Sequence, residues 1–117
     1  MSSKKKHLKP WGYYINIIEK NDFKIKEICI YPKQQPSYQF HNRRKEYWVI
    51  LSGVGKSIID GKVSKVKKGD ILKVNKKQKH HLINTSKIKD LRFVEIMMGS
   101  YFGEDDIVRV HDLYKRK

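Results

Sequence analysis

Two groups of polar side chains in this sequence are suited to binding a metal ion. Gln39 and His41 stand two residues apart and Glu46 follows them, while His80 and His81 come from a distant segment. Side chains alternate along a strand, so Gln39 and His41 point to the same face and can converge on one ion. Imidazole nitrogens, a carboxylate and an amide oxygen form a mixed set that suits Zn, Mn, Fe or Co. Taken singly, each is also an ordinary polar residue on the surface of a β protein.

The segments that must position these residues are short and rich in β-formers. From Trp11 onward, runs rich in Ile, Val, Tyr and Phe are separated by turn residues, and the pair Asp60-Gly61 is typical of a two-residue hairpin. The expected strands cover residues 13–18, 24–31, 38–39, 47–51, 55–60, 62–66, 71–74, 81–84 and 91–97. Many short strands at close spacing favour a small antiparallel barrel or sandwich.

The composition limits the chain to one domain and excludes several classes of protein. A chain of 117 residues has room for one core. Its 27 Lys and Arg exceed its 12 Asp and Glu by 15, which raises nucleic acid as a partner. The lysines are spread along the chain, however, so we interpret them as solvated surface and expect no nucleic-acid partner. No apolar run reaches the roughly 18 residues of a membrane span, and no signal peptide follows the basic start. We therefore expect a cytoplasmic protein without a membrane partner.

The spacing of the metal-binding candidates resembles the two motifs of the cupin superfamily. In the first motif, His41, Glu46 and Gly53 fall in register, while Lys33 takes a glycine position and Gln39 takes that of the first histidine. In the second, the matching residues are Gly69, His80 and Asn84, and Asn75 and Lys77 replace a proline and a glycine. The resemblance implies an all-β fold, a small cupin-type antiparallel β-barrel (jelly roll) with a short C-terminal helical or irregular tail.

A narrower resemblance covers residues 9 to 116. The chain is similar to the type II mannose-6-phosphate isomerase domain, which usually forms the C-terminal part of bifunctional enzymes that also carry a mannose-1-phosphate guanylyltransferase. The runs that carry this likeness are Lys9-Pro10-Trp11-Gly12-Tyr13-Tyr14, Phe23-Lys24-Ile25-Lys26, Ser37-Tyr38-Gln39-Phe40-His41, Arg44-Lys45-Glu46-Tyr47-Trp48 and Tyr101-Phe102-Gly103-Glu104-Asp105-Asp106-Ile107-Val108-Arg109. The nucleotidyltransferase part is missing, so we expect no GDP-mannose synthesis from this chain.

The resemblance implies a set of site residues. One divalent metal ion, Zn first with Mn, Co, Fe or Mg as alternatives, is expected on Gln39, His41, Glu46 and His80. The implied reaction interconverts mannose-6-phosphate and fructose-6-phosphate through a cis-enediolate, with Glu95 as the base that moves the proton between C1 and C2. Arg109 is expected to bind the phosphate or the enediolate, because a guanidinium binds phosphate oxygens in two places.

Arg116 and Arg44 are the further candidates for binding the substrate. Arg44 has an alternative role, pairing with Glu46 or Asp70, and Glu95 has one too, pairing with one of the many lysines. Several positions differ from the family pattern, namely Asn42, Arg43, Tyr47, Asn75, Lys77, Met97 and Lys115. In the segments Asn42-Arg43 and Glu46-Tyr47-Trp48, the chain lacks two histidines of the family pattern. Two alternatives therefore stay open: a non-catalytic cupin that binds a sugar phosphate or nucleotide sugar, and a cupin that acts on a nucleotide-linked sugar.

The expected organisation is simple. Residues 1–8 are interpreted as a disordered basic arm, and residues 9–117 as a single cupin domain. Gly103 and the three acidic residues after it suit a turn that brings the tail back over the mouth of the barrel. Small barrels often pair through exposed strand edges, so the expected partners are a small sugar phosphate and a second copy of the chain in a homodimer.

Overall fold

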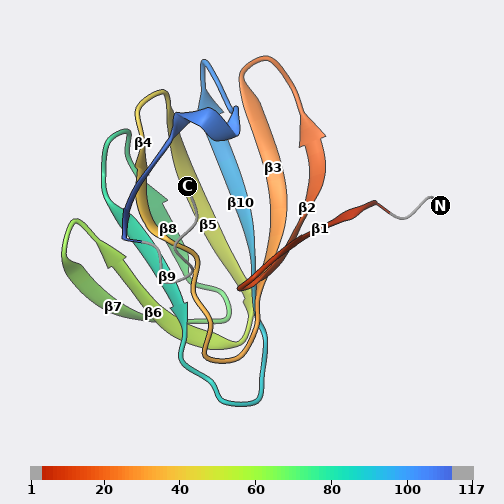
Figure 1. The fold of residues 1–117 in the computed structure, drawn as a ribbon, viewed down its shortest axis with the longest axis vertical. Helices are drawn as coiled ribbons and strands as arrows, with labels where there is room; N and C mark the ends of the chain where they lie inside the picture. The colour runs from red at the N-terminus through yellow and green to blue at the C-terminus, as the bar shows by residue number, and fades with distance from the viewer. Residues whose placement is uncertain (1–3, 112–117) are drawn as a thin grey trace.

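The computed structural model describes residues 4–111, and most of them belong to strands (Figure 1). The strands are β1 (Lys6–Lys9), β2 (Gly12–Glu19), β3 (Phe23–Ile30), β4 (Tyr38–His41), β5 (Arg44–Ser52), β6 (Val54–Ile59), β7 (Lys62–Lys67), β8 (Ile71–Val74), β9 (His80–Asn84), β10 (Leu91–Gly99) and β11 (Ile107–His111). A single 3₁₀ turn, η1 (Glu104–Asp106), precedes β11. Among the described residues, no helix is long and apolar enough to cross a membrane.

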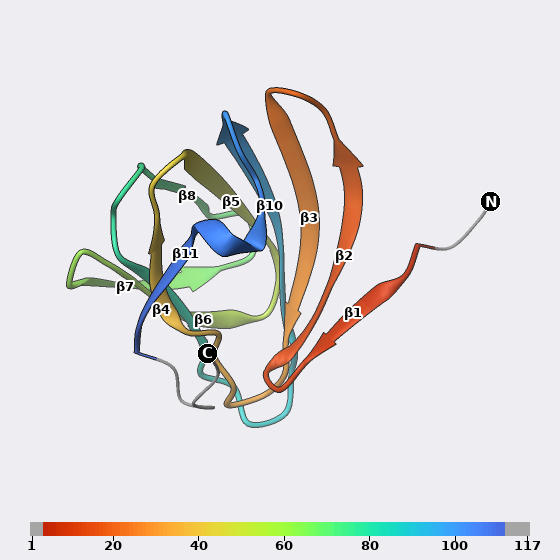
Figure 2. The same ribbon diagram turned by 45° about the horizontal axis from the view of Figure 1, so that its top comes forward.

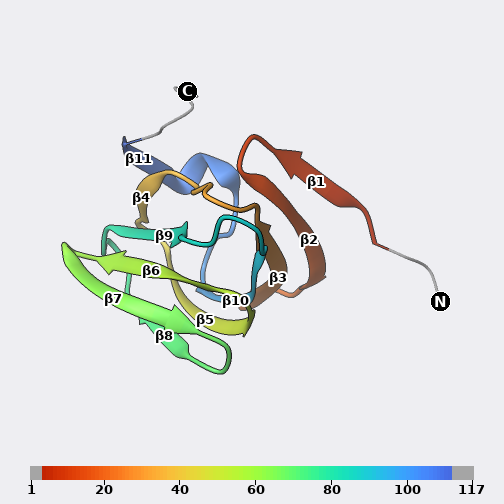
Figure 3. The same cartoon turned by 90° about the horizontal axis from the view of Figure 1, so that it is seen from below.

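The strands form two antiparallel sheets, which confirms the all-β prediction. One has six strands in the order β1-β2-β3-β10-β5-β8, and the other has five in the order β11-β4-β9-β6-β7. The two sheets curl around a shared interior, while β1 and β2 extend outward beyond it (Figure 2). Seen from below, β9, β6 and β7 lie side by side as one wall (Figure 3). The edge strands are β1 and β8 in the first sheet and β11 and β7 in the second. Pairing of two chains through such edges, and so the homodimer, stays a prediction.

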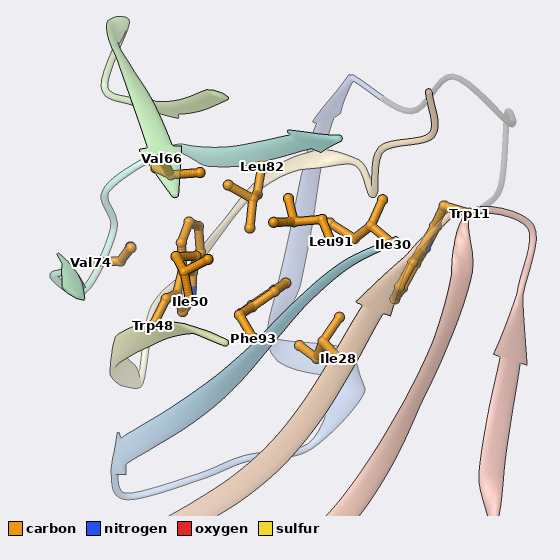
Figure 4. Packing of buried hydrophobic residues seen from close by; sticks show 10 residues of the cluster. All are labelled: Trp11, Ile28, Ile30, Trp48, Ile50, Val66, Val74, Leu82, Leu91 and Phe93. Carbon is orange, nitrogen blue, oxygen red and sulfur yellow. The ribbon is translucent and has the colours of Figure 1, made fainter. Parts of the chain in front are cut away.

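The core fills the space between the sheets. Alternate positions of β3, β5 and β10 point inward from the six-stranded sheet, and Leu82 and Val66 approach from the other sheet (Figure 4). The buried cluster comprises Trp11, Ile28, Ile30, Trp48, Ile50, Val66, Val74, Leu82, Leu91 and Phe93. Burying each large apolar side chain contributes about 1.5 to 3 kcal/mol. The core therefore fixes which side chains of each strand face the interior.

The prediction of a disordered arm is wrong for its described end, because β1 begins at Lys6. β1 pairs with β2, with Leu8 opposite Tyr13. The ring of His7 stacks on that of Tyr14 with 4.6 Å between centroids, and the Lys6 ammonium lies 4.4 Å from the centre of the Tyr13 ring. These contacts with tyrosines order a segment whose own sequence is merely basic.

Up to His111, the C-terminal segment differs from the expected helical or irregular tail. η1 supplies the predicted turn, but the following residues form β11 and pair with the outer edge of β4, with Val108 opposite Phe40. The Asp106 carboxylate accepts hydrogen bonds from the backbone N–H groups of Asn42 and Arg43, at 3.3 and 3.0 Å. This contact fixes the start of β11 beside β4, so a strand replaces the tail. Residues 112–117 lie outside the described part.

The motif positions occupied by lysine keep the backbone that glycine would adopt. Lys33 and Lys77 have φ angles of 64° and 65°, in the left-handed region that side chains other than glycine disfavour. At Gly53, a side chain would collide with the carbonyl oxygen of Asp90. The turns of the two motifs therefore keep their backbone conformation. Each lysine with a positive φ reduces the free energy of unfolding by about 1 to 2 kcal/mol.

Candidate metal centre

Three of the four predicted metal ligands converge inside the barrel. His41 ends β4, Glu46 lies in β5 and His80 begins β9, and all three are buried. The His41 Nε2 atom lies 3.3 Å from Glu46 Oε2, and the His80 Nε2 atom lies 3.8 Å from Glu46 Oε1. One ligand atom from each residue lies within 4.8 Å of the others. The geometry matches a compact site for one ion.

Hydrogen bonds to the backbone fix the orientation and the tautomer of both imidazole rings. His41 Nδ1 lies 3.2 Å from the carbonyl oxygen of Asp106, and His80 Nδ1 lies 3.1 Å from that of Gln78. A carbonyl only accepts, so each Nδ1 carries the hydrogen and each Nε2 turns a lone pair toward Glu46. Burial lowers the pKa of His41 to about 3 and also lowers the pKa of His80, which keeps both rings neutral. Two lone pairs and a carboxylate facing one another favour a cation, so the donor set fits a divalent metal.

Gln39, the fourth predicted ligand, lies beside this cluster. It is the register partner of His80 across β4 and β9, and both residues line one cavity, which is described below. Its Oε1 accepts a hydrogen bond from the hydroxyl of Ser37 at 3.2 Å. The amide oxygen is thus held next to His80 by its neighbour two residues earlier in the chain.

Arg44 is a buried partner of the ligands. Its Nε donates to Glu46 Oε2 at 3.0 Å, and its Nη2 donates to His41 Nε2 at 3.0 Å. The pairing with Glu46 offered as its alternative role is therefore present, whereas Asp70 pairs with Lys67. An ion held by His41 uses the same lone pair, so ion and guanidinium compete for it. A role for Arg44 in substrate binding stays a prediction.

Glu95 lies in β10 with its side chain in the same cavity and only 8% exposed. Burial, followed by the nearby charge of Glu46 and a hydrogen bond to it, raises the pKa of Glu95 to about 8. The carboxyl group is therefore protonated at neutral pH in the protein without metal, and it is not one of the surface carboxylates that pair with exposed lysines.

The cavity lined by Gln39, Arg44, His80 and Glu95 opens to solvent and measures about 90 Å³, which is room for an ion and a few water molecules. His41 and Glu46 are not among its lining residues. Arg109 of β11 is half-buried and lines it, and its role in binding the substrate stays a prediction. Arg116 lies outside the described residues. His81 packs against Tyr38, with 5.8 Å between ring centroids, and does not belong to the ligand cluster.

Lys26 lines the cavity and was missed by the sequence analysis. It is 5% exposed and lies in β3. The signal was present in the sequence, because Lys26 has the same parity as Ile28 and Ile30, both of which point into the core. A lysine at an inward-facing position of a strand is the pattern that identifies it.

Known proteins match this chain over nearly its whole length. The family model described as Mannose-6-phosphate isomerase C-terminal matches residues 1–112. The chain is 34% identical over 108 residues to the alginate biosynthesis protein AlgA of Pseudomonas aeruginosa, and 35% identical over 108 residues to a mannose-1-phosphate guanylyltransferase of Escherichia coli. Each match covers 92% of this chain but only 22% of the relative.

A solved structure supports the expected type of barrel. The cupin domain of Schizosaccharomyces pombe Cnp3 superposes with a TM-score of 0.74 at 12% identity, covering 80% of this chain and 68% of that one. This likeness, at such low identity, concerns the fold alone, and it confirms the cupin prediction. Together with the match to the family model, it shows that the chain belongs to the mannose-6-phosphate isomerase C-terminal family of cupin domains.

Proposed function

We propose that this chain is a metal-dependent isomerase that interconverts mannose-6-phosphate and fructose-6-phosphate in the cytoplasm. The observation that carries the proposal is the convergence of two neutral imidazoles on Glu46. Of these three residues, His80 lines a cavity that Glu95 and Arg109 also line. A cation, a buried carboxyl group and a metal-binding cluster at one cavity are the groups that an aldose–ketose isomerisation requires.

His41, Glu46 and His80, with Gln39 beside them, would hold the ion. When bound, a divalent ion polarises the hydroxyl and carbonyl oxygens of a sugar as a Lewis acid. Glu46 would be committed to the ion and already accepts a hydrogen bond from Arg44, so it is a poor base. We assign the proton transfer between C1 and C2 to Glu95, which is buried beside it. Its carboxyl group is protonated at neutral pH without metal, and the charge of a bound cation would favour the ionised form that accepts the proton.

The substitutions at family histidine positions do not change the lining of the cavity. Asn42 and Arg43 are exposed, and their backbone N–H groups donate to Asp106. Neither these two residues nor Tyr47 lines the cavity. The proposed proton transfer and substrate binding therefore do not depend on the side chains at these positions.

An assay of isomerase activity separates the proposal from its alternatives. Purified protein is treated with chelator, loaded with Zn or Mn and incubated with mannose-6-phosphate. We expect fructose-6-phosphate to form only with metal, and about one ion per chain by elemental analysis. The double variant His41→Ala, His80→Ala should lose both ion and activity. A chain that binds the ion and the sugar phosphate without product would instead be the binding module, and turnover of a nucleotide-linked sugar alone would indicate the third function.

Arg109 provides a second test of the same site. Arg109→Ala should weaken mannose-6-phosphate binding at least tenfold, about 1.4 kcal/mol. The melting temperature should change little, because half-exposed ion pairs contribute only about 0 to 1 kcal/mol. Unchanged affinity with a large loss of stability would make Arg109 a structural residue of β11.

A further inference from the structure

Trp11 carries a hydrogen-bond donor for which the described part of the chain offers no acceptor. Its side chain is 7% exposed, and its Nε1–H is shielded from solvent without a hydrogen-bond partner. The second tryptophan differs, because Trp48 Nε1 donates to Glu46 Oε1 at 3.0 Å. Buried indole N–H groups usually have a partner, and a buried donor without one destabilises the fold. The donor of Trp11 is therefore available to an acceptor that a ligand brings.

The backbone around Trp11 is held in place by β3. The Trp11 carbonyl oxygen accepts a hydrogen bond from the N–H of Tyr31 at 2.9 Å, and Gly12 pairs with Ile30 at the end of β3. A side chain at Gly12 would collide with the carbonyl oxygen of Cys29, so the two strands lie in close contact there. The indole therefore extends from a fixed point, just before β2 and beside the end of β3.

Trp11 stands at the end of the cavity that is remote from the metal-binding cluster. Trp48 lies next to His80, with 5.5 Å between ring centroids, and Phe93 lies next to Trp48, at 5.7 Å. Ile28 is opposite Phe93 across β3 and β10, and Figure 4 shows these two side chains between Trp48 and Trp11. All five residues line the cavity. One wall therefore runs from a proposed metal ligand to the unpaired indole donor.

We propose that the Nε1–H of Trp11 donates a hydrogen bond to an oxygen atom of the bound sugar phosphate, away from the carbons that react. A ligand with its reacting carbons at the metal cluster extends along this wall, so its remaining hydroxyl or phosphoryl oxygens come to the end where Trp11 lies. Lys9, two residues earlier, lines the cavity with a long, half-buried side chain that can move aside for the ligand. The identity of the sugar rests on the proposed function, whereas the unpaired donor does not.

Nuclear magnetic resonance tests this contact directly. Protein with isotopically labelled nitrogen has two indole N–H signals, one for each tryptophan, and replacing either Trp11 or Trp48 by phenylalanine identifies them. We expect mannose-6-phosphate, added to metal-loaded wild-type protein, to move the Trp11 signal downfield, as a new hydrogen bond does. Inorganic phosphate distinguishes the two sources of the oxygen, because it should move the signal only if a phosphoryl oxygen is the acceptor.

Calorimetry with mannose-6-phosphate measures how much the contact contributes to binding. Trp11→Phe keeps an aromatic ring and removes the donor, and it should weaken binding about tenfold, because this donor has no bond to water to give up when the ligand binds. The matched control is Tyr13→Phe, which removes a hydroxyl group from the same segment at a residue that does not line the cavity. The control should leave affinity unchanged, and melting curves verify that both variants fold.

Isomerase activity is measured on the same wild-type preparation, so the two proposals are judged separately. A Trp11 signal that stays in place in a protein that converts mannose-6-phosphate would refute the contact and leave the proposed function standing, and so would a folded Trp11→Phe variant with normal affinity. A signal that moves without any conversion would support the contact and refute the isomerase. Wild-type protein that neither binds nor converts the sugar phosphate would refute both.

Discussion

Replacing Glu95 by glutamine should change how the stability of the metal-free protein depends on pH. The pKa of Glu95 is raised to about 8 in the folded protein from 4.5 in the unfolded chain, with burial as the main cause. Between these two values the folded state binds a proton that the unfolded state lacks. Stability contributed by this proton is full below pH 4.5 and is lost as pH rises toward 8.

The size of the effect follows from the linkage between protonation and folding. Each pH unit inside the window changes the free energy of unfolding by about 1.4 kcal/mol. The histidines act in the opposite direction, because His41, with its pKa lowered to about 3, destabilises the fold only below about pH 6.5. Between pH 6.5 and 8 the wild type should therefore lose roughly 2 kcal/mol through Glu95. Glu95→Gln keeps a neutral polar group there and should lose almost nothing.

Urea denaturation in the presence of chelator, at several pH values from 6.5 to 8, measures this difference. Glu27→Gln is a suitable control, because Glu27 lies on the neighbouring strand, pairs with Arg92 at 3.0 Å and leaves Glu95 intact. The control should follow the wild-type slope. Parallel curves for wild type and Glu95→Gln would refute the reasoning, since Glu95 would then titrate alike in the folded and unfolded states.

Three further substitutions have expected effects on urea denaturation. Asn84→Leu should reduce the free energy of unfolding by about 2 to 4 kcal/mol. The fully buried amide of Asn84 donates to two backbone carbonyls and accepts a hydrogen bond from one backbone N–H, and all three backbone groups lose their partner in the variant. Asp106→Ala should cost about 1 to 2 kcal/mol, since two backbone N–H groups lose their acceptor; an unchanged midpoint would show that β11 is held by its strand pairing alone. Lys77→Gly should stabilise the protein by up to about 1 kcal/mol by relieving its positive φ, whereas Lys76→Gly should not.

The sequence predicted most of the barrel because its signals there are local. Nine strands and the Asp60-Gly61 hairpin were found from alternation and turn residues, and both turn residues have positive φ, as that hairpin requires. The convergence of His41, Glu46 and His80 was predicted from motif spacing. These residues lie at or near the ends of strands β4, β5 and β9. Their spacing along the chain therefore determines where their side chains lie in the barrel.

Features that depend on distant contacts were not predicted. β1 is basic, and what orders it is pairing with β2 and stacking on Tyr14, neither of which a single segment reveals. β11 likewise requires the free edge of β4. The burial of Arg44 and Lys26 was missed because composition favours solvated lysine and arginine, whereas the position of each residue on the inward face decides its environment.

The register that pairs Glu95 of β10 with Lys26 of β3 and Trp48 of β5 also bears on the fidelity of folding. Sliding β3 by one residue along β10 would place Glu27 or Ile25 opposite Glu95. The same slip would turn Ile28 and Ile30 toward solvent, since neighbouring residues of a strand face opposite sides. Misaligned pairings thus lose apolar burial, and the slip that places Glu27 opposite Glu95 also sets two carboxyl groups against each other. The side chains that line the cavity therefore help to select the correct alignment of the sheet during folding.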